Sequence, residues 1–169
     1  TIEPRKNIAS IIESFNILKK QKKYQNLELV IAGAKGWKYE NVFSLASDSS
    51  YQKQIHFIGY VPRKDKTYIY NLAQIFLFPS YYEGFGLPVL EAQACGLPVI
   101  CGLNSSLPEI TQGSALYVNP YNLTELIKTI KILLNSPKLS NELIKKGLKN
   151  SQKYTWQKTA GQTLDLLTA

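Results

Sequence analysis

Several residue types are scarce in this chain of 169 residues, and each shortage excludes a class of protein. Two cysteines and one histidine are too few for a disulfide scaffold or for a zinc site. We therefore expect Cys95 and Cys101 to be reduced, small apolar residues of the core. Apolar runs such as Ile75 to Phe78 fall far short of the roughly 18 residues that a membrane-spanning helix needs. Methionine is absent, and this predicts that the chain begins inside a longer protein.

Positive charge is missing from the middle of the chain, although the net charge is +8. Such an excess is typical of proteins that bind nucleic acid, an acidic membrane surface or a phosphorylated small molecule. No Lys or Arg lies between Thr67 and Ile127, and the excess gathers in residues 19–23 and 128–158. No basic stripe with interleaved aromatic residues is evident, so the charge alone gives a nucleic-acid binder little support.

Short apolar segments alternate with helical patterns along the chain. Such an alternation predicts a doubly wound, Rossmann-like parallel sheet with helices on both faces, an α/β fold in a single domain of residues 1–169. The strands are expected at 27–32, 55–58, 75–78, 98–101 and 115–118. The helices are expected at 8–18, 40–46, 64–73, 88–94, from a cap at Asn122 or Thr124 to 134, 140–153 and 156–167.

The segment from Phe76 to Ile110 carries the strongest chemical pattern, in which Glu83 is followed after seven residues by Glu91. A glycine-rich turn, residues 84–86, lies between a predicted strand end and a predicted helix start. Ligands of parallel sheets bind beyond the carboxyl ends of strands, and the first N–H groups of a helix attract phosphates. Carboxylates at this place can accept hydrogen bonds from sugar hydroxyls. Because the segment has no Lys or Arg, cations that balance a phosphate must come from elsewhere in the sequence.

Five segments, in order along the chain, resemble the C-terminal nucleotide-sugar-binding domain of the group 1 (family 4) retaining glycosyltransferases of the GT-B fold. They are Glu3 to Asn7 (EPRKN), Phe57 to Val61 (FIGYV), Glu83 to Glu91 (EGFGLPVLE), Ala94 to Val99 (ACGLPV) and Ser105 to Glu109 (SSLPE). The last segment has Ser where the family commonly has Gly. Thr1 stands where many members have Arg, and the resemblance then gives that task to Arg5.

The resemblance implies a role for each matching residue. Glu83 would contact hydroxyls of the donor sugar, while Arg5 and Lys6 would neutralise the departing diphosphate. Glu91 would hold the ribose hydroxyls of the nucleotide. The other donor-binding positions would be the backbone N–H groups of Phe85, Gly86 and Leu87, together with Gly33, Tyr60 and Val61. The reaction would retain configuration and would need no metal and no cofactor besides the nucleotide diphosphate sugar.

The same resemblance sets expectations for the whole protein. The first, central strand of the sheet and the N-terminal acceptor domain would precede Thr1, and the isolated domain would be inactive. The donor would carry a hexose, with a GDP-mannose type favoured over a UDP-sugar, and the acceptor would be a glycan or a lipid-linked glycan in polysaccharide or glycoconjugate biosynthesis. We expect a cytoplasmic protein, with peripheral contact at the inner face of the membrane as a weaker hypothesis. A nucleotide-sugar-binding module without transferase activity is the alternative.

Overall fold

Short strands alternate with helices throughout the computed structural model, which describes residues 1–168. The strands are β1 (Leu29–Ala32), β2 (Ile55–Gly59), β3 (Phe76–Phe78), β4 (Val99–Gly102) and β5 (Leu116–Val118). The helices are α1 (Ile8–Lys19), α2 (Glu40–Ser47), α3 (Lys66–Leu72), α4 (Leu87–Ala94), α5 (Leu107–Thr111), α6 (Leu123–Leu134), α7 (Pro137–Ser151) and α8 (Trp156–Thr168). All strand pairs are parallel, and this confirms the predicted α/β fold.

The strands form two sheets, β1-β2 and β3-β4-β5. A doubly wound sheet places its first strand between the second and the fourth, which here would be β1 and β3. Within residues 1–168 these two strands do not pair with each other. Ile2, which is buried, makes a single parallel bridge with Lys35 just after β1.

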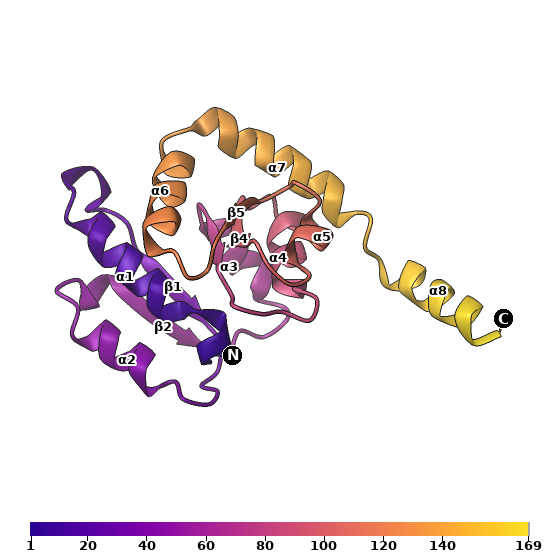
Figure 1. Ribbon diagram of the computed structural model, residues 1–169, viewed down its shortest axis with the longest axis horizontal. Helices are drawn as coiled ribbons and strands as arrows, with labels where there is room; N and C mark the ends of the chain where they lie inside the picture. The colour runs from indigo at the N-terminus through magenta and orange to yellow at the C-terminus, as the bar shows by residue number, and fades with distance from the viewer. Residues whose placement is uncertain (169) are drawn as a thin grey trace.

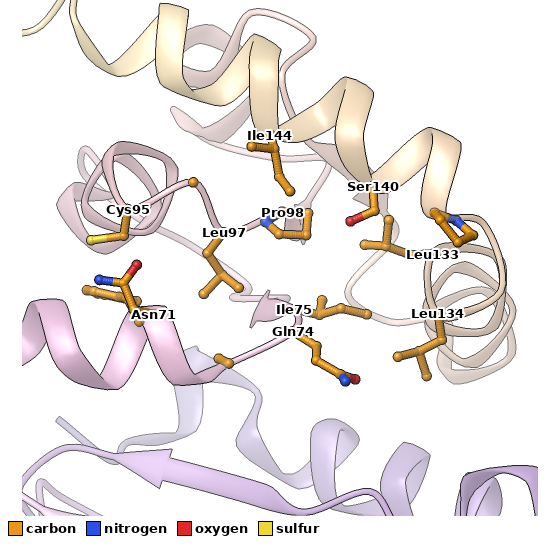
Figure 2. Close-up of a pocket in the computed structure, with 14 residues that line it drawn as sticks. Asn71, Gln74, Ile75, Cys95, Leu97, Pro98, Leu133, Leu134, Ser140 and Ile144 are labelled. Carbon is orange, nitrogen blue, oxygen red and sulfur yellow. The ribbon is translucent and has the colours of Figure 1, made fainter.

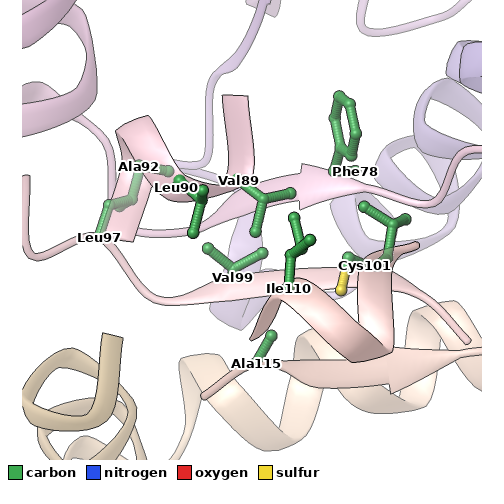
Figure 3. Close-up of a cluster of buried hydrophobic side chains, with 10 residues drawn as sticks. Phe78, Val89, Leu90, Ala92, Leu97, Val99, Cys101, Ile110 and Ala115 are labelled. Carbon is green, nitrogen blue, oxygen red and sulfur yellow. The ribbon is translucent and has the colours of Figure 1, made fainter. Parts of the chain in front are cut away.

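The helices cover the two sheets and pack on one another. Helix α1 packs on α2 and on α6, and α4 packs on α7 (Figure 1). Every residue of β4 is buried, which suits the middle strand of its sheet. Figure 3 shows Val89, Leu90 and Ala92 of α4 gathered beside Val99 of β4, in the same cluster as Cys101. Burial raises the pKa of the Cys101 thiol to about 12, so this cysteine is an inert core residue as predicted.

A buried polar network fixes α4 against α7. Gln93 of α4 donates from Nε2 to Ser114 Oγ at 2.7 Å, and Asn150 of α7 donates from Nδ2 to Gln93 Oε1 at 3.0 Å and to the Ile110 carbonyl at 2.8 Å. A Cβ added at Gly147 of α7 would lie 3.1 Å from Gln93 Cγ, so the two helices approach closely at this glycine. The position of α4 is therefore set by a helix more than fifty residues later in the sequence.

Lys19 is buried, whereas Lys20, Lys22 and Lys23 beside it are exposed. The side chain is only 2% exposed, and Nζ donates to the Gln25 carbonyl and, at 3.0 Å, to the Leu27 carbonyl. Two carbonyl acceptors compensate the ammonium group for lost water. This lysine therefore holds the turn between α1 and β1.

Two helix boundaries also differ from the expectation. Helix α7 begins at Pro137, three residues earlier than predicted, because Ser136 caps it and proline suits a first helical position. The sequence predicts no helix at α5, because its single turn is too short to show a helical period. At α6 the cap is Asn122, whose Oδ1 accepts from the Glu125 N–H at 3.0 Å.

Helix α8 projects away from the rest of the molecule in Figure 1, and none of its described residues is buried. Throughout residues 1–168, no helix combines the length and the apolar character that crossing a bilayer requires.

Candidate functional site

The loop after β3 holds Glu83 beneath the surface, where 6% of the residue is exposed. Pro79 ends the strand, and the chain is then tied to the loop before α5. The Glu83 N–H donates to Ser105 Oγ at 3.1 Å, and Ser106 Oγ donates to the Phe85 carbonyl at 2.8 Å. Ser105 and Ser106 thus fix the backbone just before the glycine-rich turn and within it.

Two cations from the other end of the sequence meet the Glu83 carboxylate. Lys6 Nζ lies 2.6 Å from Glu83 Oε1, and Arg5 Nη1 lies 2.9 Å from Oε2. The Tyr81 N–H donates to the Arg5 carbonyl at 2.8 Å, which anchors this segment beside the loop. The structure therefore brings together the three residues predicted to carry the chemistry, although 77 and 78 residues separate them along the chain.

The charges of this cluster decide the state of Glu83. Burial opposes ionisation, but hydrogen bonds from Lys6 and Arg5 outweigh it and hold the pKa of the Glu83 carboxyl below its ordinary value. The same contacts with Glu83 raise the pKa of the Arg5 guanidinium in spite of its partial burial. Glu83 and Arg5 are consequently both charged at neutral pH.

Glu3 extends the cluster towards the loop after β1. Arg5 Nη2 lies 2.8 Å from Glu3 Oε1, and Trp37 Nε1 donates to Glu3 Oε2 at 3.2 Å. The Arg5 side chain is 42% exposed, whereas that of Lys6 is 15% exposed. Arg5 is thus the cation that can most easily leave its carboxylates for a ligand.

Gly86 begins α4 in a conformation that favours glycine. Its φ is 104°, and a Cβ at this position would lie 2.8 Å from Leu107 Cδ2. The N–H groups of Phe85, Gly86 and Leu87 have no acceptor within the described part of the chain. Phe85 and Leu87 are also half exposed, at 45% and 49%. The turn therefore presents open backbone donors at the start of a helix, where an anion binds favourably.

Glu91 lies about one turn further along α4, and it too has a cation from outside the central segment. Lys66 Nζ lies 2.8 Å from Oε1 and 3.1 Å from Oε2, and Tyr70 Oη donates to Oε2 at 3.0 Å. Both partners come from α3. The sequence did not indicate these partners, although Lys66 is the last basic residue before the stretch that lacks positive charge.

The remaining predicted residues lie at the carboxyl ends of β1 and β2. The Gly33 N–H donates to the Gly59 carbonyl at 2.7 Å, and a Cβ at Gly33 would lie 3.0 Å from the Thr1 nitrogen. Tyr60 follows β2 and is 74% exposed, while Val61 is partly buried. Within residues 1–168, no hydrogen bond joins these three to Glu83 or Glu91.

A cavity of about 450 Å³ lies elsewhere, at the amino ends of β3 and β4 (Figure 2). Its walls come from the segments before these strands and from α3, α6 and α7, with Ile75, Leu97 and Ile144 among the lining residues. None of the predicted site residues lines it. No group of three or more His, Cys, Asp or Glu residues that could hold a metal ion is present in residues 1–168.

Comparison with known proteins identifies the family of this chain. The family model described as "Glycosyl transferases group 1" matches residues 1–150. The chain is 32% identical over 165 residues to the O-antigen chain mannosyltransferase B of Escherichia coli, covering 98% of this chain and 43% of that protein. It thus spans less than half the length of this relative.

Solved structures share the fold at lower identity. The sucrose-phosphate synthase of Thermosynechococcus elongatus superposes with a TM-score of 0.87 at 24% identity, over 99% of this chain and 43% of that chain. The Anabaena protein Alr3699/HepE, solved in complex with UDP and glucose, gives 0.86 at 16% identity, over 98% and 46%. These neighbours are GT-B glycosyltransferases. Because the family model covers most of the residues, the chain belongs to the group 1 glycosyltransferases.

Proposed function

We propose that this chain forms the donor-binding part of a retaining hexosyltransferase, which moves a hexose from a nucleotide diphosphate sugar to a glycan or lipid-linked acceptor. One observation carries the proposal: Glu83 lies beside Arg5 and Lys6 at the carboxyl end of β3, next to the open N–H groups of a glycine turn. A carboxylate for sugar hydroxyls and cations for a diphosphate are thus assembled in one place.

The two cations suit a reaction whose leaving group gains negative charge. As the bond to the sugar breaks, charge develops on the diphosphate, and a cation 4 Å away stabilises it by about 4 kcal/mol at an effective dielectric constant near 20. Arg5 would turn from Glu3 towards the diphosphate, since it is the more exposed cation. Lys6 would hold the Glu83 carboxylate in place and at the same time balance charge on the diphosphate.

The other residues would hold the rest of the donor. Glu83 would accept hydrogen bonds from the sugar hydroxyls, and the N–H groups of Phe85, Gly86 and Leu87 would donate to the sugar or the diphosphate. Glu91 would accept from the ribose. Hydrogen bonds to a charged partner contribute roughly 1.5–3 kcal/mol each, so these contacts are strong enough to orient the donor.

The remaining donor positions and the metal requirement rest on the family resemblance. Tyr60 and Val61 would lie beside the base, largely through the main chain, and Gly33 would end the strand that helps line the cleft. Neutralisation of the diphosphate by Arg5 and Lys6 would make a metal unnecessary.

Mannose is the favoured sugar and GDP the favoured nucleotide. The support is the similarity to a relative whose name is O-antigen chain mannosyltransferase B. The acceptor would bind through a part of the protein outside this chain, so residues 1–169 alone would not turn over. We place the reaction in the cytoplasm, where nucleotide sugars are made, with lipid-linked acceptors at the membrane face.

The test measures sugar transfer by the complete protein with GDP-, UDP- and ADP-sugars, and binding by thermal shift with the same panel. Glu83→Ala and Lys6→Ala should each lower kcat/KM strongly, and Lys158→Ala on exposed α8 is the matched control. Intact kcat/KM in both site variants would refute the proposed site. Donor binding by the wild type without transfer to any acceptor would support the alternative, a binding module.

A further inference from the structure

Lys66 occupies a position that helix stability does not explain. It is the first residue of α3, where the positive end of the helix dipole disfavours a cation and favours an acidic residue. The first turn of α3 contains no acidic residue. Since the local structure opposes a lysine here, the reason for it lies in what its side chain contacts.

That contact is the carboxylate of Glu91. Lys66 Nζ reaches both oxygens, at 2.8 and 3.1 Å, while Tyr70 Oη from the next turn of α3 donates to Oε2 at 3.0 Å. Burial and the neighbouring carboxylate raise the pKa of Tyr70, so its hydroxyl stays protonated and remains a donor. One face of α3 thus holds the plane of the Glu91 carboxylate from two directions.

The arrangement leaves room for a ligand on the same carboxylate. An ionised carboxyl group has about four acceptor sites. Lys66 and Tyr70 occupy both sites of Oε2 and one site of Oε1, so one site of Oε1 is open. The Glu91 side chain is 37% exposed, and a hydroxyl donor from solvent or ligand can reach it.

We propose that Lys66 is a positioning residue, which together with Tyr70 fixes the Glu91 carboxylate to accept a ribose hydroxyl and so gives the site its preference for ribonucleotides. This inference rests on the proposed function, in which Glu91 meets the ribose. Lys66 acts in a second way too, because its charge balances Glu91 beside the anionic diphosphate. Without it, the carboxylate would repel the nucleotide that it has to bind.

The experiment uses the complete protein and three variants. Lys66→Met removes the charge and keeps the length of the side chain, Lys66→Arg restores a cation, and Lys64→Met is the control. Lys64 is exposed and makes no ion pair within residues 1–168. The measurements are kcat and KM for the donor, and the inhibition constants of the matching nucleoside diphosphate (GDP or UDP) and of its 2′-deoxy and 3′-deoxy forms.

In the wild type, one of the two deoxy forms should bind about tenfold more weakly than the ribonucleotide, since it lacks a hydrogen bond to a charged group. Lys66→Met should raise the donor KM about fivefold, as for a partly exposed ion pair, and leave kcat unchanged. It should also remove most of the discrimination against the deoxy form. Lys66→Arg should restore most of the donor KM and most of the discrimination against the deoxy form, and Lys64→Met should match the wild type in both.

Two results would overturn the inference while the proposed function stands. One is full ribose discrimination in Lys66→Met, and the other is an equal loss of affinity for ribo and deoxy forms, which would mean that Lys66 contacts the phosphates. A wild-type enzyme that transfers sugar but does not distinguish ribo from deoxy forms would overturn it as well. A wild-type protein that transfers no sugar would overturn the proposed function and this inference together.

Discussion

Replacing Glu83 by Gln should lower the free energy of unfolding by about 2 kcal/mol at neutral pH. The substitution keeps the shape of the side chain and removes its charge, so Lys6 and Arg5 are left close together without their carboxylate. The bond from Lys6, at 2.6 Å and mostly buried, should account for most of the loss. The contribution of Arg5 is smaller, because solvent screens its half-exposed side chain.

The pH dependence makes this prediction specific. The folded-state pKa of Glu83 lies below its ordinary value of 4.5, so the charged group stabilises the folded state fully above about that pH. The stabilisation is lost as the pH falls through the folded-state pKa. The difference between wild type and Glu83→Gln should therefore be largest near pH 7 and should shrink below pH 4.5.

Urea denaturation at a series of pH values measures this difference, with Glu142→Gln as the control. Glu142 is also paired with a lysine, Lys146, but on the exposed surface of α7. Its replacement should change stability little at any pH. A Glu83→Gln variant that is as stable as the wild type at pH 7, or whose deficit is the same at pH 3, would refute the reasoning.

Three further substitutions test parts of the fold. Gly86→Ala should destabilise the protein by about 1–3 kcal/mol and weaken donor binding, because φ is positive and the new Cβ would lie 2.8 Å from Leu107 Cδ2. Calorimetry measures the stability and a titration with the donor measures the affinity, and unchanged values would contradict this prediction. Lys19→Met should lower the free energy of unfolding by about 1–3 kcal/mol, since the carbonyl of Leu27 loses its donor. Chemical denaturation measures this change, and an unchanged stability would mean that water replaces the ammonium group. Asn122→Ala should lower the free energy of unfolding by about 1 kcal/mol, because α6 loses its N-cap, and Asn122→Ser should lower it less. Equal losses of stability in the two variants would exclude capping as the cause.

The order of strands and helices could be predicted because the sequence pattern is local. Each strand is a short apolar run closed by glycine or proline, and helices such as α1 and α6 show their apolar face every three or four residues. The helix boundaries were less accurate where a single cap decides them, as Ser136 does at the start of α7. Helix α5 was missed because one turn gives no period to detect.

The site was predicted in part, and the reason lies in distance along the chain. The Glu83 to Glu91 segment is continuous, so its pattern is visible, and the resemblance to a family supplied Arg5 and Lys6. Lys66 and Glu91 are 25 residues apart and lie on different helices, and no local rule indicates their pairing. The burial of Lys19 has a different reason, because its acceptors are backbone carbonyls that no side-chain pattern reveals.

The ion pairs of the site affect how the affinity for a ligand depends on ionic strength. Arg5, Lys6 and Lys66 each contact a carboxylate, so within residues 1–168 this cluster offers no uncommitted cation to solution. A diphosphate that binds would replace carboxylates as the contact of these cations, and it would not be attracted by an excess of positive charge at the site. Its affinity should therefore change only modestly with ionic strength, unlike that of a polyanion attracted to the overall charge of +8. Arg5 and Lys66, whose side chains are more exposed than that of Lys6, would exchange their partners more readily.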